Sequence, residues 1–172
     1  MIRSIASPLA AAALLAGCAA APAPELVRHP LPNGSTFPIA SAVEVRGDVG
    51  TVYLSGQVPP NQDATPGPGR APDYGADTKA QTIGTLRAIE KTLAGMGLSM
   101  GDVVKMQVFL VGDPAKGGKM DFAGFMDGYT QFFGTAAQPN LPSRSAFQIA
   151  ALANPAFLVE IEVVAVRRKP SR

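Results

Sequence analysis

The 172-residue chain contains one cysteine, one histidine and no tryptophan. A single cysteine excludes an internal disulfide framework, and a single histidine beside it argues against a zinc site of thiolates and imidazoles. Charged residues make up only 16% of the chain, and the formal net charge is +2. Such a chain lacks the strong positive field that binds nucleic acid. The hydrophobic share of 47% nevertheless fits one globular domain with a core and excludes wholesale disorder.

No apolar run in the sequence reaches the roughly 20 residues of a membrane-spanning helix. Residues 1–17 instead have the pattern of a signal peptide, in which Arg3 precedes the short apolar run Leu9 to Ala16. Leu15-Ala16-Gly17-Cys18 resembles the bacterial lipobox, whose cysteine is acylated and becomes the new N-terminus. We expect lipidation at Cys18, and the alternative is an ordinary signal peptide that ends near a cysteine. Ala19 in place of aspartate favours the outer membrane, so the expected location is the periplasm-facing cell envelope of a Gram-negative bacterium.

The segment 18–36 is expected to be the lipidated cysteine followed by a flexible tether. It starts with small residues and prolines, which neither form a helix nor pack well. His29 falls in this stretch and is expected to be a surface histidine. The folded domain is then expected over residues 37–169, with no internal repeat.

Hydrophobic periodicity divides that domain into strands and helices. The β-rich segments 42–45 and 51–58 are joined across residues 47–50, which predicts a hairpin. A loop with five prolines and two glycines follows at 59–73, and it lacks the Gly-Lys-Ser/Thr ending of a phosphate-binding loop. The remaining expected elements are a helix from Asp77 or Thr78 to about Met96, a strand over 102–111, an aromatic-striped helix over 120–133, and strands over 143–152 and 157–166.

This ββαβαββ order predicts an α+β sandwich, with two helices packed on one face of a mixed sheet. The aromatic stripe of the second helix is expected to fill the core rather than to bind a cofactor. The other face of the sheet would need a cover, and self-association into a closed ring would supply one and create clefts between subunits. We expect Arg144, Gln148, Glu160 and Glu162 on that uncovered face.

Few residues in this chain are candidates for catalysis or ligand binding. The sequence offers no Ser-His-Asp arrangement outside the expected tether. Arg144 is followed by the small residues Ser145 and Ala146, which would leave its guanidinium free to bind a carboxylate in two-pronged fashion. Glu160, in a partly apolar cleft, could transfer a proton to or from water. The spacing alone equally allows a purely structural Arg–Glu pair between subunits.

Five short segments occur in order along the chain and narrow these alternatives. They are Val52-Tyr53-Leu54-Ser55-Gly56-Gln57-Val58-Pro59, then Gln81-Thr82, Gly101-Asp102-Val103-Val104-Lys105, Leu141-Pro142-Ser143-Arg144-Ser145 and Val159-Glu160-Ile161-Glu162. Together they resemble the Rid family, also called YjgF or L-PSP endoribonuclease-like. The resemblance runs from about Phe37 to Arg168. It implies a chorismate-mutase-like fold, a homotrimer and ligand clefts between subunits.

The resemblance also implies an activity and roles for residues. Members hydrolyse reactive enamines and imines to 2-oxo acids and ammonia, as 2-iminobutanoate/2-iminopropanoate deaminases do, without a cofactor or metal. By position, Arg144 would bind the substrate carboxylate and Glu160 would orient or activate the attacking water. Ser55 and Gly56 would line the cleft, and the backbone of Ala146 would help to hold the carboxylate.

The chain departs from the family pattern at three places. Ile39 stands where the family has a cleft tyrosine, Ala146 replaces a frequent cysteine, and the loop 60–77 is longer than usual. The expected function is therefore an exported Rid-like deaminase acting on small carboxylate-bearing imines. The alternative is a non-catalytic trimeric lipoprotein that binds a small carboxylate or a partner protein. Ribonuclease activity is a third possibility, and the charge balance speaks against it.

Overall fold

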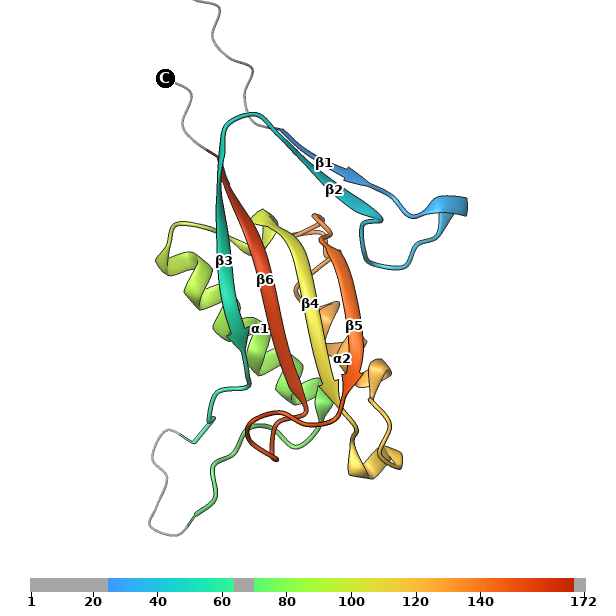
Figure 1. The fold of residues 1–172 in the computed structure, drawn as a ribbon, viewed down its shortest axis with the longest axis vertical. Helices are drawn as coiled ribbons and strands as arrows, with labels where there is room; N and C mark the ends of the chain where they lie inside the picture. The colour runs from blue at the N-terminus through green and yellow to red at the C-terminus, as the bar shows by residue number, and fades with distance from the viewer. Residues whose placement is uncertain (1–24, 64–69, 169–172) are drawn as a thin grey trace, which may run out of the picture.

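The computed structural model describes residues 25–63 and 70–168, so the predicted signal peptide and Cys18 lie outside the described residues. A four-stranded sheet forms one layer and two helices cover one of its faces (Figure 1). The strands are β1 (Glu25–His29), β2 (Ala42–Arg46), β3 (Val49–Gln57), β4 (Val103–Val111), β5 (Ser143–Ile149) and β6 (Val159–Arg168). The helices are α1 (Thr78–Gly95) and α2 (Phe122–Tyr129), and short 3-10 turns occur at Pro32–Gly34, Met100–Asp102 and Pro114–Lys116.

The main sheet has the strand order β3-β6-β4-β5. β6 pairs antiparallel with both β3 and β4, whereas β4 and β5 run parallel, so the sheet is mixed. Met106, Val108 and Leu110 of β4 are fully buried under the helices, and the residues between them are only partly buried. This alternation follows from the two-residue period of a strand with one covered face. The predicted α+β sandwich with two helices on one face is confirmed.

Each helix has an aspartate as its N-cap residue. The Asp77 carboxylate accepts a hydrogen bond from the Ala80 amide at 2.7 Å, and Asp121 accepts one from Gly124 at 3.0 Å. Each caps an otherwise unpaired amide of the first helical turn. α2 is shorter than predicted, because after Tyr129 the helix gives way to turns in which the amides of Gln131 and Phe132 bond to carbonyls three residues back. Phe133 nevertheless remains buried, as the predicted stripe requires.

The N-terminal part of the chain differs from the prediction. Residues expected in the tether form β1, and β2 pairs with β1 rather than with β3, so the predicted 42–58 hairpin is wrong. The chain bends at Gly47, whose φ of 81° suits glycine, and β2 leaves the main sheet (Figure 1). Arg28 holds β1 in place by donating to the carbonyl oxygens of Gly101, Val103 and Leu141. Its guanidinium thereby satisfies three backbone acceptors between elements far apart in sequence.

Within the described residues, neither helix combines the length and the apolar character that crossing a bilayer requires.

Candidate ligand-binding and catalytic site

Arg144 lies on the helix-covered face of the sheet. In the parallel pairing of β4 and β5 it lies opposite Met106, which is fully buried under the helices. Residues paired in register point to the same face, so Arg144 and Gln148 point towards the helix layer. The expectation that they share the uncovered face with Glu160 and Glu162 is therefore wrong. The sequence showed the alternation along each strand, but the face depends on the register between strands.

Aromatic rings enclose the Arg144 guanidinium. Its central carbon is 4.3 Å from the ring centroid of Tyr129, 4.9 Å from Phe125, 5.5 Å from Phe37 and 5.9 Å from Phe122. We call these four rings the aromatic cage. Three of them come from the same helix, where a spacing of three to four residues aligns side chains on one face. Rings at these distances stabilise a cation through their quadrupoles.

No carboxylate faces Arg144 within the described part of the chain. Nη2 contacts the Met126 sulfur at 3.2 Å, and Nη1 is buried without any hydrogen-bond partner. Burial lowers the pKa of Arg144, and burial also raises the pKa of Tyr129 to about 12. An unpartnered, charged donor is costly in the interior. The cage thus encloses a guanidinium whose Nη1 group is available to donate hydrogen bonds to an anion.

Glu160 lies on the other, uncovered face of the sheet. It sits between the buried residues Val159 and Ile161, so its side chain points away from the helices. Arg144 forms no ion pair with Glu160 or Glu162 of its own chain, because the two glutamates are on β6, two strands from β5 and on the opposite face. The alternative of an Arg–Glu pair between subunits stays a prediction. The backbone of Glu160 pairs with β4, but its carboxylate makes no hydrogen bond or ion pair with any described side chain.

Gly56 and Ser55 lie beside Glu160. The β3–β6 register shifts between Leu54 and Gln57, and this bulge brings the backbone of Gly56 against the Glu160 carboxylate. A Cβ at position 56 would meet that carboxylate, so a larger residue there would require the Glu160 side chain to move. Ser55 is exposed. Sheet geometry thus gathers three of the predicted site residues at one end of the uncovered face.

Ala146 remains with Arg144 on the covered face. It lies opposite Val108 in the parallel ladder and packs partly buried against the core. The structure therefore divides the predicted site into two half-sites, Arg144 with Ala146 and Glu160 with Ser55 and Gly56. No three His, Cys, Asp or Glu side chains in residues 25–63 and 70–168 cluster closely enough to hold a metal ion.

The cage itself was missed by sequence reasoning, which assigned the α2 aromatics to the core alone. Phe125 and Tyr129 are indeed fully buried, but their rings also face a charge. Phe37, distant in sequence, closes the cage and is 39% exposed. Two sequence features could have indicated the cage. One is the aromatic stripe of the helix, and the other is the single charged residue, Arg144, on an otherwise uncharged strand.

The fold and these half-sites define an α+β protein in which an arginine beneath one face of the sheet and a glutamate on the other have no ion-pair partner among the described residues. A model of the Endoribonuclease L-PSP family matches residues 35–167. The chain therefore belongs to this family, also known as YjgF/Rid, whose structures have the chorismate-mutase-like fold.

Three relatives illustrate the similarity. The chain is 35% identical over 133 residues to the 2-iminobutanoate/2-iminopropanoate deaminase of Escherichia coli (strain K12), covering 76% of this chain and 92% of the relative. It is 35% identical over 122 residues to a RutC family protein of Haemophilus influenzae, covering 70% and 83%. The crystal structure of E. coli TdcF with bound serine superposes with a TM-score of 0.52 at 33% identity, covering 81% of this chain and 94% of that one.

Proposed function

We propose that the protein hydrolyses small carboxylate-bearing imines and enamines to 2-oxo acids and ammonia. The observation that carries the proposal is the Arg144 guanidinium, caged by aromatic rings and without a carboxylate partner among the described residues. A planar guanidinium matches a carboxylate with two parallel hydrogen bonds. Relatives named as imine deaminases support the same activity.

The chemistry requires a fixed substrate and a proton carrier. Arg144 would hold the carboxylate of the 2-imino acid, which orients the C=N carbon. Water adds to that carbon while the nitrogen gains a proton, and the resulting carbinolamine expels ammonia to leave the 2-oxo acid. Glu160 would accept the proton of the attacking water and return it to the leaving nitrogen. The step needs no cofactor, since water is the only co-reactant.

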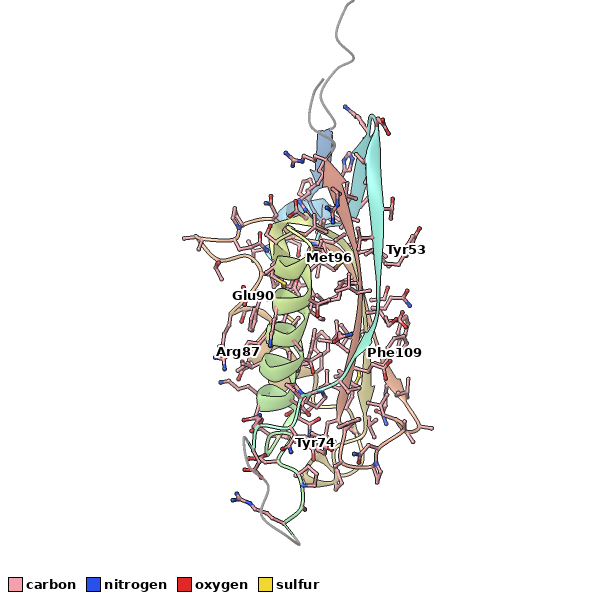
Figure 2. The ribbon with its side chains drawn as sticks, turned by 90° about the vertical axis from the view of Figure 1, so that its left-hand side faces the viewer. Tyr53, Tyr74, Arg87, Glu90, Met96 and Phe109 are labelled. Atoms are coloured by element: carbon pink, nitrogen blue, oxygen red, sulfur yellow. The ribbon has the colours of Figure 1, made fainter. Side chains whose placement is uncertain are left out.

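Bringing the two half-sites together requires a second copy of the chain. Arg144 and Glu160 occupy opposite faces of one sheet. We propose a homotrimer in which the uncovered face of one subunit meets the Arg144 edge of the next. The uncovered face supports this, because Tyr53 and Phe147 are 78% and 48% exposed there. Figure 2 shows Tyr53 and Phe109 on the side of the sheet away from α1. Exposed apolar patches of this kind mark interfaces.

The decisive test is imine hydrolysis by the purified full-length protein in detergent. An amino-acid oxidase generates the imine, and semicarbazide traps what remains. We expect faster loss of imine and faster ammonia release than in the enzyme-free control. Absence of any acceleration, together with binding of 2-oxo acids, would instead establish the non-catalytic carboxylate-binding lipoprotein. The separation of Arg144 from Glu160 within one chain is the observation that favours this second function.

We further propose that the protein is exported and attached to the membrane through Cys18 alone. The support is the lipobox-like Leu15-Ala16-Gly17-Cys18 and the short apolar run before it. In a Triton X-114 partition, the wild type should enter the detergent phase and Cys18→Ser should move to the aqueous phase. A Cys18→Ser protein that stays in the detergent phase contradicts the anchor.

A further inference from the structure

The aromatic cage has a buried floor and an accessible rim. Phe125 and Tyr129 form the floor and are fully buried. Phe37 is 39% exposed, and Phe122 and Met126 are partly buried. The Phe37 and Phe122 rings stack with centroids 6.4 Å apart. A carboxylate bound to Arg144 would therefore have its substituent next to this pair of rings and the Met126 thioether.

Within its own subunit, the described surroundings of Arg144 offer a substituent few free hydrogen-bonding groups. The recorded side-chain contacts of the guanidinium in the described chain are four rings and one sulfur. The Tyr129 hydroxyl already donates to the Pro38 carbonyl at 3.0 Å, and the Ser143 hydroxyl donates to the Val104 carbonyl at 3.2 Å. A polar substituent placed here would lose water without gaining a partner, which is unfavourable. An apolar substituent would bury its surface against the rim.

We infer that this chain selects 2-imino acids with bulky apolar side chains, aromatic or branched aliphatic, over those derived from alanine or serine. The inference rests on the proposed deaminase function and names its substrate class. Phe37 and Met126 are the specificity-determining residues, since both contact the guanidinium and neither is fully buried. Stacking of an aromatic substituent on Phe37 and Phe122 adds to its burial.

The test compares imines of one reaction class on the full-length protein. Amino-acid oxidase supplies imines of phenylalanine, leucine, alanine and serine, and the enzyme-dependent kcat/KM is measured for each. Differences of one or more methylene groups in an apolar pocket change kcat/KM by about tenfold or more. We expect the phenylalanine- and leucine-derived imines to exceed those of alanine and serine by at least about tenfold.

Single substitutions test whether the rim residues cause the preference for apolar substrates. Phe37→Ala should reduce kcat/KM for the phenylalanine-derived imine by a factor at least about ten times larger than for the alanine-derived imine. Met126→Asn, which adds hydrogen-bonding groups, should narrow the gap between serine and leucine imines. The matched control is Phe157→Ala, because the Phe157 ring contacts Tyr74 rather than Arg144. It should leave the ranking of the four imines unchanged.

Calorimetric titration with phenylpyruvate and pyruvate separates this inference from the proposed function. If no imine is hydrolysed, the deaminase proposal fails, while tighter binding of phenylpyruvate than of pyruvate still supports the selectivity. If hydrolysis occurs with equal or higher kcat/KM for alanine and serine imines, the selectivity is overturned and the deaminase proposal stands. Absence of hydrolysis together with failure to bind either 2-oxo acid overturns both. If Phe37→Ala leaves the ranking of the four imines by kcat/KM unchanged, the selectivity does not come from the rim residues.

Discussion

The two faces of the main sheet carry opposite charges in different surroundings. On the covered face, Arg144 is enclosed by rings among fully buried residues such as Met106 and Val108. On the uncovered face, Glu160 lies beside Gly56 with no partner in the described chain. Arg144 thus lies between the sheet and the helix layer, among aromatic rings. Glu160 is partly exposed and lies beside the bulge of β3. Neither charged group has a side-chain ion pair within residues 25–63 and 70–168.

This difference shows how one fold can keep two reactive groups apart until an assembly joins them. Arg144 and Glu160 cannot neutralise each other across a sheet, because their side chains leave opposite faces. A buried ion pair within the chain would have consumed the anion-binding capacity of Arg144. The separation therefore leaves both groups available for a ligand and a water molecule.

The largest expected effect comes from the uncovered face. Glu160→Gln removes the proton carrier but keeps the shape of the side chain, so imine hydrolysis should fall by about 10²- to 10⁴-fold. Binding of a 2-oxo acid, which depends on Arg144, should change much less. The measurements are kcat for the preferred imine and calorimetric titration with the 2-oxo acid.

Glu162→Gln is the matched control for this prediction. Glu162 shares β6 and the uncovered face with Glu160, but the carboxylate that lies against Gly56 is that of Glu160. Activity of Glu162→Gln should stay within a few-fold of wild type. Equal losses in the two variants would assign the effect to general charge on this face rather than to proton transfer by Glu160.

The next largest effect belongs to the covered face. Arg144→Lys replaces a two-pronged donor by a point charge, and it should weaken 2-oxo-acid binding by about 1.5–3 kcal/mol. Because Arg144 has no carboxylate partner in the described chain, no ion pair is lost, and the oligomeric state should be retained. Calorimetric titration and thermal unfolding on the same sample measure both quantities.

Arg87→Lys provides the control, since Arg87 lies on the side of α1 away from the sheet (Figure 2). It should bind 2-oxo acids as wild type does. A lower melting temperature of Arg144→Lys with unchanged 2-oxo-acid binding would make Arg144 a structural residue. That result would remove it from the proposed site.

Local patterns in the sequence were sufficient to predict the main layer of the fold. Alternation in residues 103–111 and capping by Asp77 are properties of neighbouring residues, and both appear in the structure. The pairing of β2 was not predictable in this way. It depends on Arg28, whose hydrogen bonds reach carbonyls more than 70 residues away.

The sequence pointed to Arg144 and Glu160 because they are charged residues on apolar strands, and their roles stay predictions. Their geometry was not predictable. Their placement on opposite faces follows from the order β3-β6-β4-β5 and its registers, which no local period encodes. The sequence could not distinguish an aromatic cage from ordinary core packing, because an aromatic stripe packs equally well against aliphatic side chains and against a guanidinium.

A third prediction measures how dry the covered face is. Burial raises the pKa of Tyr129 from its ordinary value of 10.0 to about 12. Between these values the unfolded chain releases a proton that the folded chain retains. The free energy of unfolding should therefore decrease by about 1.4 kcal/mol per pH unit above pH 10, up to about 2.7 kcal/mol.

Denaturant unfolding at pH 9, 10 and 11 checks this dependence. Tyr129→Phe should remove the part of the alkaline loss that belongs to this hydroxyl. It should also cost about 0.5–1.5 kcal/mol at pH 8, because the hydrogen bond to Pro38 is lost. Tyr53→Phe, on the uncovered face, is the matched control and should retain the alkaline loss. An unchanged pH dependence in Tyr129→Phe would show that water reaches the cage floor.

The smallest effect on the single chain is expected at Tyr53, which is 78% exposed. Tyr53→Ser removes no buried contact of the isolated subunit, so its free energy of unfolding should change by less than about 0.5 kcal/mol at concentrations where the protein is monomeric. In an assembly that covers this face, however, binding between subunits adds stability that grows with concentration. The wild-type melting temperature should therefore rise with protein concentration, and Tyr53→Ser should weaken that rise. A concentration-independent melting temperature in the wild type, with a monomeric mass by light scattering, would leave Glu160 without a route to Arg144.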